Sequence, residues 1–132
     1  MRTEATFRSS AFNTSDVKPY FINPGCFGDD LAKWIMARLR SSGVRTADEP
    51  RQEDFGWYFE FEVPAGTHCC VLGYQADHPE GLWLLWLERR RGFLGSIFGM
   101  RKRGIDPAAV KALQDVLGAA PEIRHLQWQD GQ

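Results

Sequence analysis

The chain has 132 residues, 43% hydrophobic and 25% charged, a composition typical of one globular domain and unlike that of a disordered chain. Its 16 basic and 17 acidic residues give a net charge of -1, which excludes nucleic-acid binding through overall charge. Three cysteines without framework spacing, no signal-like N-terminal run and no apolar stretch of ~18–20 residues predict a cytoplasmic protein that does not span a membrane.

The first part of the chain predicts edge strands followed by one amphipathic helix. Residues 3–13 and 17–22 have weak strand patterns, and a turn signal follows them. Asp29 or Asp30 is placed to cap a helix that ends near Gly43, since carboxylates accept bonds from unpaired N–H groups at a helix start. The apolar stripe of this helix consists of Leu31, Trp34, Ile35 and Leu39.

A polar stretch, residues 44–53, is expected to be a loop, and the strongest strand pattern of the chain follows it in residues 54–63. Alternation over this strand predicts one buried face and one wet face. The expected buried face holds Phe55, Trp57, Phe59, Phe61 and Val63, and the wet face holds Gly56, Tyr58, Glu60 and Glu62.

Two further strands are expected at residues 68–75 and 82–90, and the second is central because it is apolar on both faces. Asp106 and Pro107 predict the start of a second helix, and residues 123–129 form a last strand. The buried face of this helix consists of Val110, Leu113, Val116 and Leu117. The order β-α-β-β-β-α-β predicts a single α+β domain over residues 1–132, an antiparallel sheet of about four to six strands with two helices packed on one face.

A Pro-x-x-Glu-Asp-aromatic-Gly-Trp element spans Pro50 to Trp57 and follows an amphipathic helix that begins Gly-Asp-Asp-Leu-Ala-x-Trp at Gly28. This pair of elements resembles small uncharacterised bacterial proteins. The resemblance covers residues 28–63. It implies the fold and a cytoplasmic setting, and it brings no activity and no catalytic residue to transfer.

The feature that departs furthest from an ordinary domain is the segment 89–104, where an apolar and glycine-rich insert separates two basic triplets without any acidic residue. Its cations would steer the approach of a partner, and its apolar side chains would anchor the contact. The alternative is a loop that folds its apolar residues back under the sheet edge. The candidate partner-binding residues are Arg89, Arg90, Arg91, Phe93, Leu94, Ile97, Phe98, Arg101, Lys102 and Arg103.

A second protein with an acidic, apolar surface fits this segment best, because such a surface uses both the cations and the apolar anchors. A membrane surface ranks next, since each basic residue near anionic lipid contributes about 1 kcal/mol. Nucleic acid ranks last, because the apolar residues would have no role on phosphate. A homodimer is also expected if one sheet face is uncovered, with Tyr58 and either Trp83 or Trp86 exposed on it.

Two other clusters invite a catalytic or metal-binding hypothesis. Asp29-Asp30 and Glu53-Asp54 are carboxylate pairs that could share a proton or hold a metal, but a helix cap and a strand-entry turn explain them better. The run His68-Cys69-Cys70 offers two ligands at most from one strand face, and no further ligand has zinc-site spacing. We therefore predict a non-enzymatic domain without metal or cofactor, with a small-ligand binder or enzyme using these groups as the alternative.

Overall fold

The structure is a computed structural model that describes residues 2–23, 25–76, 81–90, 100–101 and 104–130. One sheet and two helices make up this part of the chain. In order they are β1 (Arg2–Arg8), α1 (Asp29–Ser41), β2 (Arg45–Thr46), β3 (Arg51–Glu53), β4 (Gly56–Val63), β5 (Gly66–Gln75), β6 (Leu82–Arg90), β7 (Met100–Arg101), α2 (Pro107–Gly118) and β8 (Arg124–Asp130). The predicted α+β class with an antiparallel sheet is confirmed.

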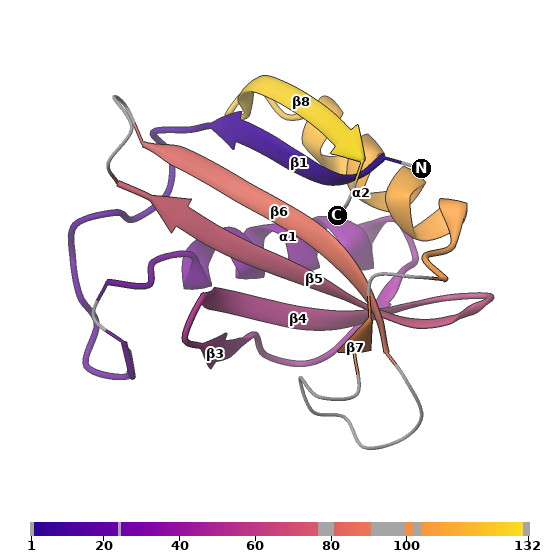
Figure 1. Cartoon of the computed structure of the whole chain (residues 1–132), viewed down its shortest axis with the longest axis horizontal. Coiled ribbons are helices and arrows are strands. Elements are labelled where there is room, and N and C mark those ends of the chain that lie inside the picture. Colours follow the sequence, from indigo (N-terminus) through magenta and orange to yellow (C-terminus); the bar gives the residue numbers. More distant parts are fainter. Residues whose placement is uncertain (1, 24, 77–80, 91–99, 102–103, 131–132) are drawn as a thin grey trace.

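The sheet has the strand order β2-β4-β5-β6-β1-β8, with β3 beside β4 and β7 beside β6 (Figure 1). All of its pairings are antiparallel. The prediction that the first strand lies at an edge is wrong, because β8 arrives from the far end of the chain and pairs with the open side of β1. Residues 17–22 form no strand.

Over the described residues the sheet contains eight strands rather than the expected four to six. The additional strands are β2, β3 and β7, which are two or three residues long. Two of them lie in the stretch 44–53 that was expected to be a loop. Segments this short cannot show the period-two alternation by which a strand is recognised in sequence.

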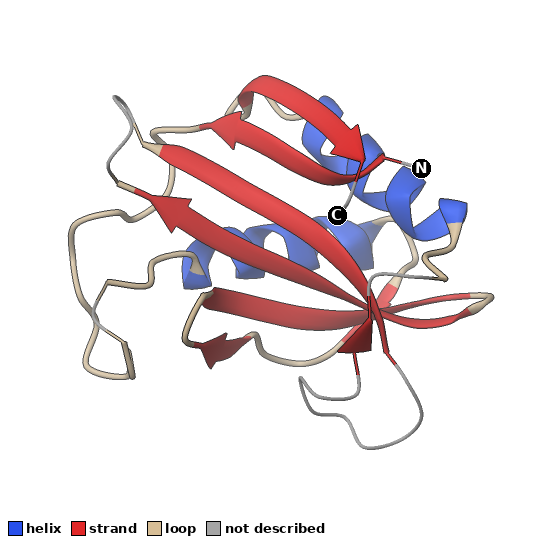
Figure 2. Ribbon diagram, in the orientation of Figure 1, coloured by secondary structure: helices blue, strands red, loops and turns tan. Residues whose placement is uncertain are grey.

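Both helices cover the same face of the sheet (Figure 2), as predicted. Leu31, Ile35 and Leu39 of α1 are fully buried against this face, as is Leu113 of α2. Burial of each such side chain contributes about 1.5–3 kcal/mol, so this layer is the main source of stability. The sheet side of the core includes Phe7, Phe59, Phe61, Leu72, Trp83, Leu85 and Leu87.

The start of α2 follows the predicted pattern, and the start of α1 differs from it. The carboxylate of Asp106 accepts a hydrogen bond from the Ala108 N–H at 2.7 Å, and Pro107 occupies the first helical position. The residue that precedes α1 is Gly28, which has no side chain to cap with. Asp30 instead accepts the Leu31 N–H at 2.9 Å from within the first turn.

The alternation predicted for β4 is correct for Trp57, Phe59 and Phe61 and wrong at three residues, since Gly56 and Tyr58 are buried and Phe55 is exposed. Trp57, Phe59 and Phe61 are buried on the helix-covered face. Phe55 precedes the strand in a turn, is 38% exposed and places its ring 5.7 Å from that of Trp86. Tyr58, expected to be wet, is buried in a small cluster on the other sheet face with Cys69 and Val71.

Candidate functional site

The base of the segment 89–104 is a strand pair, β6 with β7. Arg89 lies opposite Arg101, and Arg90 lies opposite Met100. The pairing therefore brings Arg89 and Arg101, the first residue of each basic triplet, together at the same end of the sheet. Like charges directly opposite each other in a sheet cost free energy unless an anion is close to them.

One of the candidate residues, Arg89, has a structural role. Its Nη1 donates to the Gly104 carbonyl at 2.9 Å, and its Nη2 donates to the Ala65 carbonyl. The guanidinium thus ties the β4–β5 turn to the segment that leads into α2. This leaves the other cations of the two triplets as the candidates for a partner.

The remaining candidates lie at or beyond the limit of the described residues. Arg90 and Arg101 are described as strand residues only. The others lie outside the described residues: Arg91, Phe93, Leu94, Ile97, Phe98, Lys102 and Arg103. The prediction that this segment binds a partner therefore stays a prediction.

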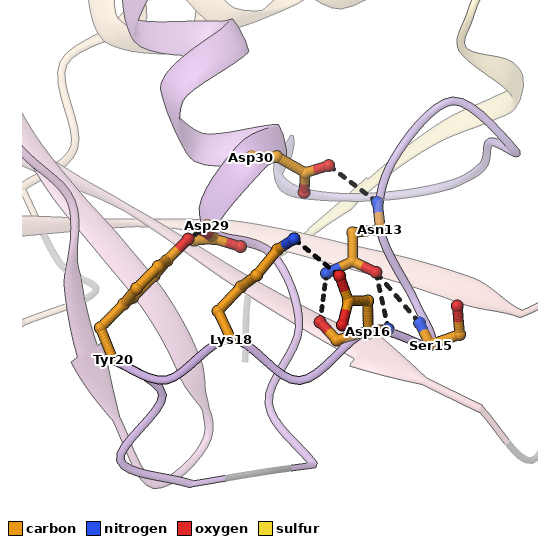
Figure 3. A network of polar contacts seen from close by, with 7 residues as sticks. All are labelled: Asn13, Ser15, Asp16, Lys18, Tyr20, Asp29 and Asp30. Atoms are coloured by element: carbon orange, nitrogen blue, oxygen red, sulfur yellow. Dashed lines mark hydrogen bonds and ion pairs between the residues drawn. The ribbon is translucent and has the colours of Figure 1, made fainter.

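A second candidate site lies where the loop between β1 and α1 crosses the start of α1 (Figure 3). The Tyr20 hydroxyl donates to the Asp29 carboxylate, and Asn13 N–H donates to the Asp30 carboxylate at 2.7 Å. The bond to Asp29, together with burial and the negative charge itself, raises the pKa of Tyr20 to about 12. The phenol is therefore a hydrogen-bond donor, not a base, at neutral pH.

The same loop is held from its other side by Gln52 of β3. Its amide nitrogen donates to the Tyr20 carbonyl at 2.7 Å, and its amide oxygen accepts the Ile22 N–H at 2.5 Å. Further along, the Trp57 indole N–H donates to the Cys26 carbonyl at 2.9 Å. The loop is thus fixed at several points by side chains of α1, β3 and β4.

Between this loop, α1 and β3 lies a pocket of about 510 Å³. Asp29 at its wall is only 4% exposed, whereas Tyr20 and Ile22 are 51% and 82% exposed at its rim. The Lys33 ammonium lies 5.7 Å from the centre of the Tyr20 ring, within reach of a cation–π interaction. The residues that line the pocket are Tyr20, Ile22, Asp29, Lys33, Glu49, Pro50, Arg51, Gln52 and Trp57.

The two carboxylate pairs singled out in the sequence do not converge into a metal site. Asp29 and Asp30 accept hydrogen bonds from the loop between β1 and α1. Glu53 lies in β3 opposite Gly56, and the Asp54 carbonyl accepts a hydrogen bond from the Cys26 thiol at 3.3 Å. Within the described residues, no three His, Cys, Asp or Glu side chains are grouped so that they could hold a metal ion. Sequence reasoning found Asp29 but missed Tyr20, Lys33 and Gln52, which carry no recognisable pattern.

The run His68-Cys69-Cys70 lies in β5 and is fully buried. The His68 Nδ1–H donates to the Gly66 carbonyl at 3.1 Å, and its Nε2 accepts the Asp106 N–H at 3.1 Å. Both ring nitrogens are therefore used, and burial lowers the pKa of the imidazole from its ordinary value. Burial also raises the pKa of the Cys70 thiol well above its usual range, so this thiol is not an activated nucleophile.

The sheet face away from the helices bears a small aromatic cluster. Trp86 faces this side, as the sequence allowed, whereas Trp83 is fully buried in the main core. The Trp86 indole N–H donates to the Glu88 carboxylate at 3.0 Å, and the exposed Phe55 ring packs beside it. No helix of the described residues covers this face (Figure 2). A homodimer packed through this face stays a prediction.

Comparison with family models, with curated proteins and with solved structures yields no match. None of the helices in the described part of the chain combines the length and the apolar character needed to cross a bilayer. The function therefore has to be argued from the geometry alone.

Proposed function

We propose that this chain is a non-enzymatic protein-interaction domain that docks through residues 89–104 onto an acidic, apolar surface of another protein. The observation that carries the proposal is the β6–β7 register, which places Arg101 opposite Arg89. Since residues 89–104 include no aspartate or glutamate, the segment itself supplies no counter-charge. An anionic partner surface would relieve the repulsion between Arg89 and Arg101 and would be attracted from a distance by the cations of the segment.

The apolar residues between the triplets favour a protein partner over other anions. Phe93, Leu94, Ile97 and Phe98 would each contribute about 1.5–3 kcal/mol if a partner groove buried them fully. A phosphate backbone offers them no such groove. A reducing, cytoplasmic setting is part of the proposal, supported by three cysteines that are all free thiols.

Removing the second triplet tests this function. The variant R101S/K102S/R103S is expected to keep the melting temperature of the wild type within a few degrees, because Arg89 retains its bonds to Ala65 and Gly104. It is expected to lose recovery of the partner in affinity purification, since the steering charges are gone. Differential scanning fluorimetry and quantitative mass spectrometry of the purified material measure the two effects.

The matched control is R38S/R45S/K111S, which removes the same charge from three exposed cations elsewhere on the domain. It should recover the partner as the wild type does. Equal recovery by both triple variants would contradict the proposal. So would flotation of the wild type with anionic vesicles but not with neutral ones, which would identify a membrane surface as the target instead.

The pocket beside Tyr20 favours a second candidate function, the binding of a small ligand. A nearly buried carboxylate at the wall of a pocket of about 510 Å³ has the size and the polar anchor of small-molecule sites. Lys33 and Arg51 provide cations in the same pocket, so its charge is mixed.

A thermal-shift screen of metabolites and nucleotides tests this second function. A true ligand should raise the melting temperature of the wild type and fail to do so with D29N, because the amide removes the negative charge at the pocket wall. D16N is the control, since Asp16 belongs to the same loop network but does not line the pocket. A flat screen, or an equal response of D29N, would dismiss the pocket as a ligand site.

A further inference from the structure

The pocket between α1, β3 and the loop that joins β1 to α1 combines charges of both signs. Among the described residues that line it, two are acidic and two are basic; they are Asp29, Glu49, Lys33 and Arg51. A ligand with charge of one sign only would be repelled by one of these pairs. A ligand that carries an anion and a cation close together would find an opposite charge for each.

The two charges on α1 have fixed places relative to each other. Asp29 and Lys33 are four residues apart, so their side chains leave the helix on the same face, one turn apart. Asp29 is nearly buried at the pocket wall, whereas Lys33 is exposed to solvent. A ligand with both charges would therefore place its cation inward at Asp29 and its anion outward, toward Lys33.

The ring of Tyr20 lies between these two charges. Its hydroxyl donates to the Asp29 carboxylate (Figure 3), and the centre of the ring is 5.7 Å from the Lys33 ammonium. A carboxylate has about four acceptor positions on its two oxygens, so the bond from Tyr20 leaves acceptor capacity for an ammonium. A cationic partner would also offset the cost of holding the Asp29 charge away from water.

Apolar side chains lie beside the charged groups. Ile22 at the rim is 82% exposed, although its backbone N–H is bonded to the Gln52 side chain and so is held in place. Pro50 and Trp57 line the same pocket. An apolar group of a ligand that covered Ile22 would remove exposed apolar surface from water.

We propose that this pocket binds a free α-amino acid with an apolar side chain, whose ammonium bonds to Asp29, whose carboxylate faces Lys33 and whose side chain covers Ile22. The inference rests on the second candidate function, the binding of a small ligand, and specifies the class of that ligand. The volume of about 510 Å³ lies within the range of about 300–1,000 Å³ that is typical of small-molecule sites. The rim loop is already fixed by hydrogen bonds with the Asp30 and Gln52 side chains, so binding requires little reordering.

Matched ligands that each lack one charged group test the class. The probes are L-leucine, isoamylamine, which lacks the carboxylate, and 4-methylpentanoate, which lacks the ammonium. Isothermal titration calorimetry of the full chain at neutral pH should give an affinity for L-leucine at least about tenfold above that for either analogue, because each analogue leaves one charged partner unpaired. The same set built on L-phenylalanine, with phenethylamine and 3-phenylpropanoate, extends the test to an aromatic side chain.

Two substitutions in α1 separate the roles of the two charges. D29N should weaken the binding of L-leucine and of isoamylamine without weakening that of 4-methylpentanoate, because the amide lacks the negative charge. K33Q should weaken the binding of L-leucine and of 4-methylpentanoate without weakening that of isoamylamine. K111Q is the matched control, since Lys111 is an exposed lysine of α2 that does not line the pocket. Circular dichroism checks that each variant is folded.

The outcomes distinguish the class of ligand from the pocket itself. The inference is overturned if neither amino acid binds, if an analogue with one charge binds as tightly as its parent amino acid, or if K33Q and K111Q bind L-leucine equally. A compound of another class that stabilises the wild type but not D29N would reject the amino acid and keep the pocket as a ligand site. A flat response to every compound would reject both.

Discussion

Replacing Gly56 with alanine is expected to lower the free energy of unfolding by about 3–5 kcal/mol, from the combined cost of a strained backbone and an overlap in a packed region. Gly56 opens β4 with φ at 149°, a conformation that residues with a side chain rarely adopt. A Cβ atom there would lie 2.1 Å from the carbonyl oxygen of Leu72. That oxygen belongs to the backbone of β5, which is paired on both sides and cannot yield as a side chain could. Urea denaturation measures the change, and the melting temperature should fall by roughly 10–20 °C.

The control for this variant is G118A. Gly118 is the last residue of α2, and a Cβ atom added there would meet nothing within 4 Å. Alanine at this position should leave stability unchanged or raise it by a few tenths of a kcal/mol, because alanine is the better helix former. If G56A unfolds with the same midpoint as G118A, the close approach of Gly56 to Leu72 does not exist in the protein.

This glycine also bears on the resemblance that the sequence suggested. In the element from Pro50 to Trp57, position 56 requires glycine because the backbone there passes close to the backbone of β5. Trp57 is buried, and its indole N–H donates to the Cys26 carbonyl. Both residues are thus explained by the fold itself. Of the rest of the element, Pro50 lines the pocket beside Tyr20, together with Arg51 and Gln52.

The sequence predicted those parts of the fold that depend on local periodicity. The helix stripe around Leu31 and Leu39, the cap at Asp106 and the buried positions Trp57, Phe59 and Phe61 each depend on residues close together in the sequence, and each is confirmed. The position of β1 between β6 and β8 depends on a pairing between the two ends of the chain. No local pattern encodes such a pairing, which is why β1 was expected at an edge.

The candidate sites were less predictable, because their geometry comes from contacts between distant segments. The Gln52 side chain forms hydrogen bonds with the backbone on both sides of Phe21. The residues next to Gln52 in the sequence contain no pattern that predicts these bonds. In the sequence, Arg89 is not distinguishable from the two arginines that follow it. In the structure, its guanidinium donates hydrogen bonds to carbonyls of two different segments.

His68 gives the second large expected effect, which depends on pH. Its imidazole connects the β4–β5 turn to the start of α2, since Nδ1 donates to the Gly66 carbonyl and Nε2 accepts from Asp106. A carbonyl only accepts and an N–H only donates, so these bonds require the neutral ring. Burial, and to a lesser degree the charge of Arg89, accordingly lower the pKa of His68 from the ordinary value of 6.5.

The direction of the pH effect follows from this lowered pKa. As pH falls below about 6.5, His68 takes up a proton in the unfolded chain but stays neutral in the folded protein, where its pKa is lower. The free energy of unfolding should therefore decrease with falling pH, by up to about 1.4 kcal/mol per unit from this residue. H68Q keeps an acceptor for the Asp106 N–H, but its side chain has no donor at the position of Nδ1, so the bond to the Gly66 carbonyl is lost. It should be less stable than the wild type by about 1–3 kcal/mol at pH 8.

The difference in the free energy of unfolding between the wild type and H68Q should then narrow as the pH is lowered from 8 to 5. Only the wild type is destabilised by the protonation of His68. Urea denaturation at several pH values measures this gap. H125Q is the matched control, since it makes the same substitution at a histidine that is exposed in β8. A constant gap between the wild type and H68Q at every pH would mean that the imidazole takes up its proton equally in the folded and unfolded chain. It would thereby contradict the hydrogen bonds that the imidazole makes to Gly66 and Asp106.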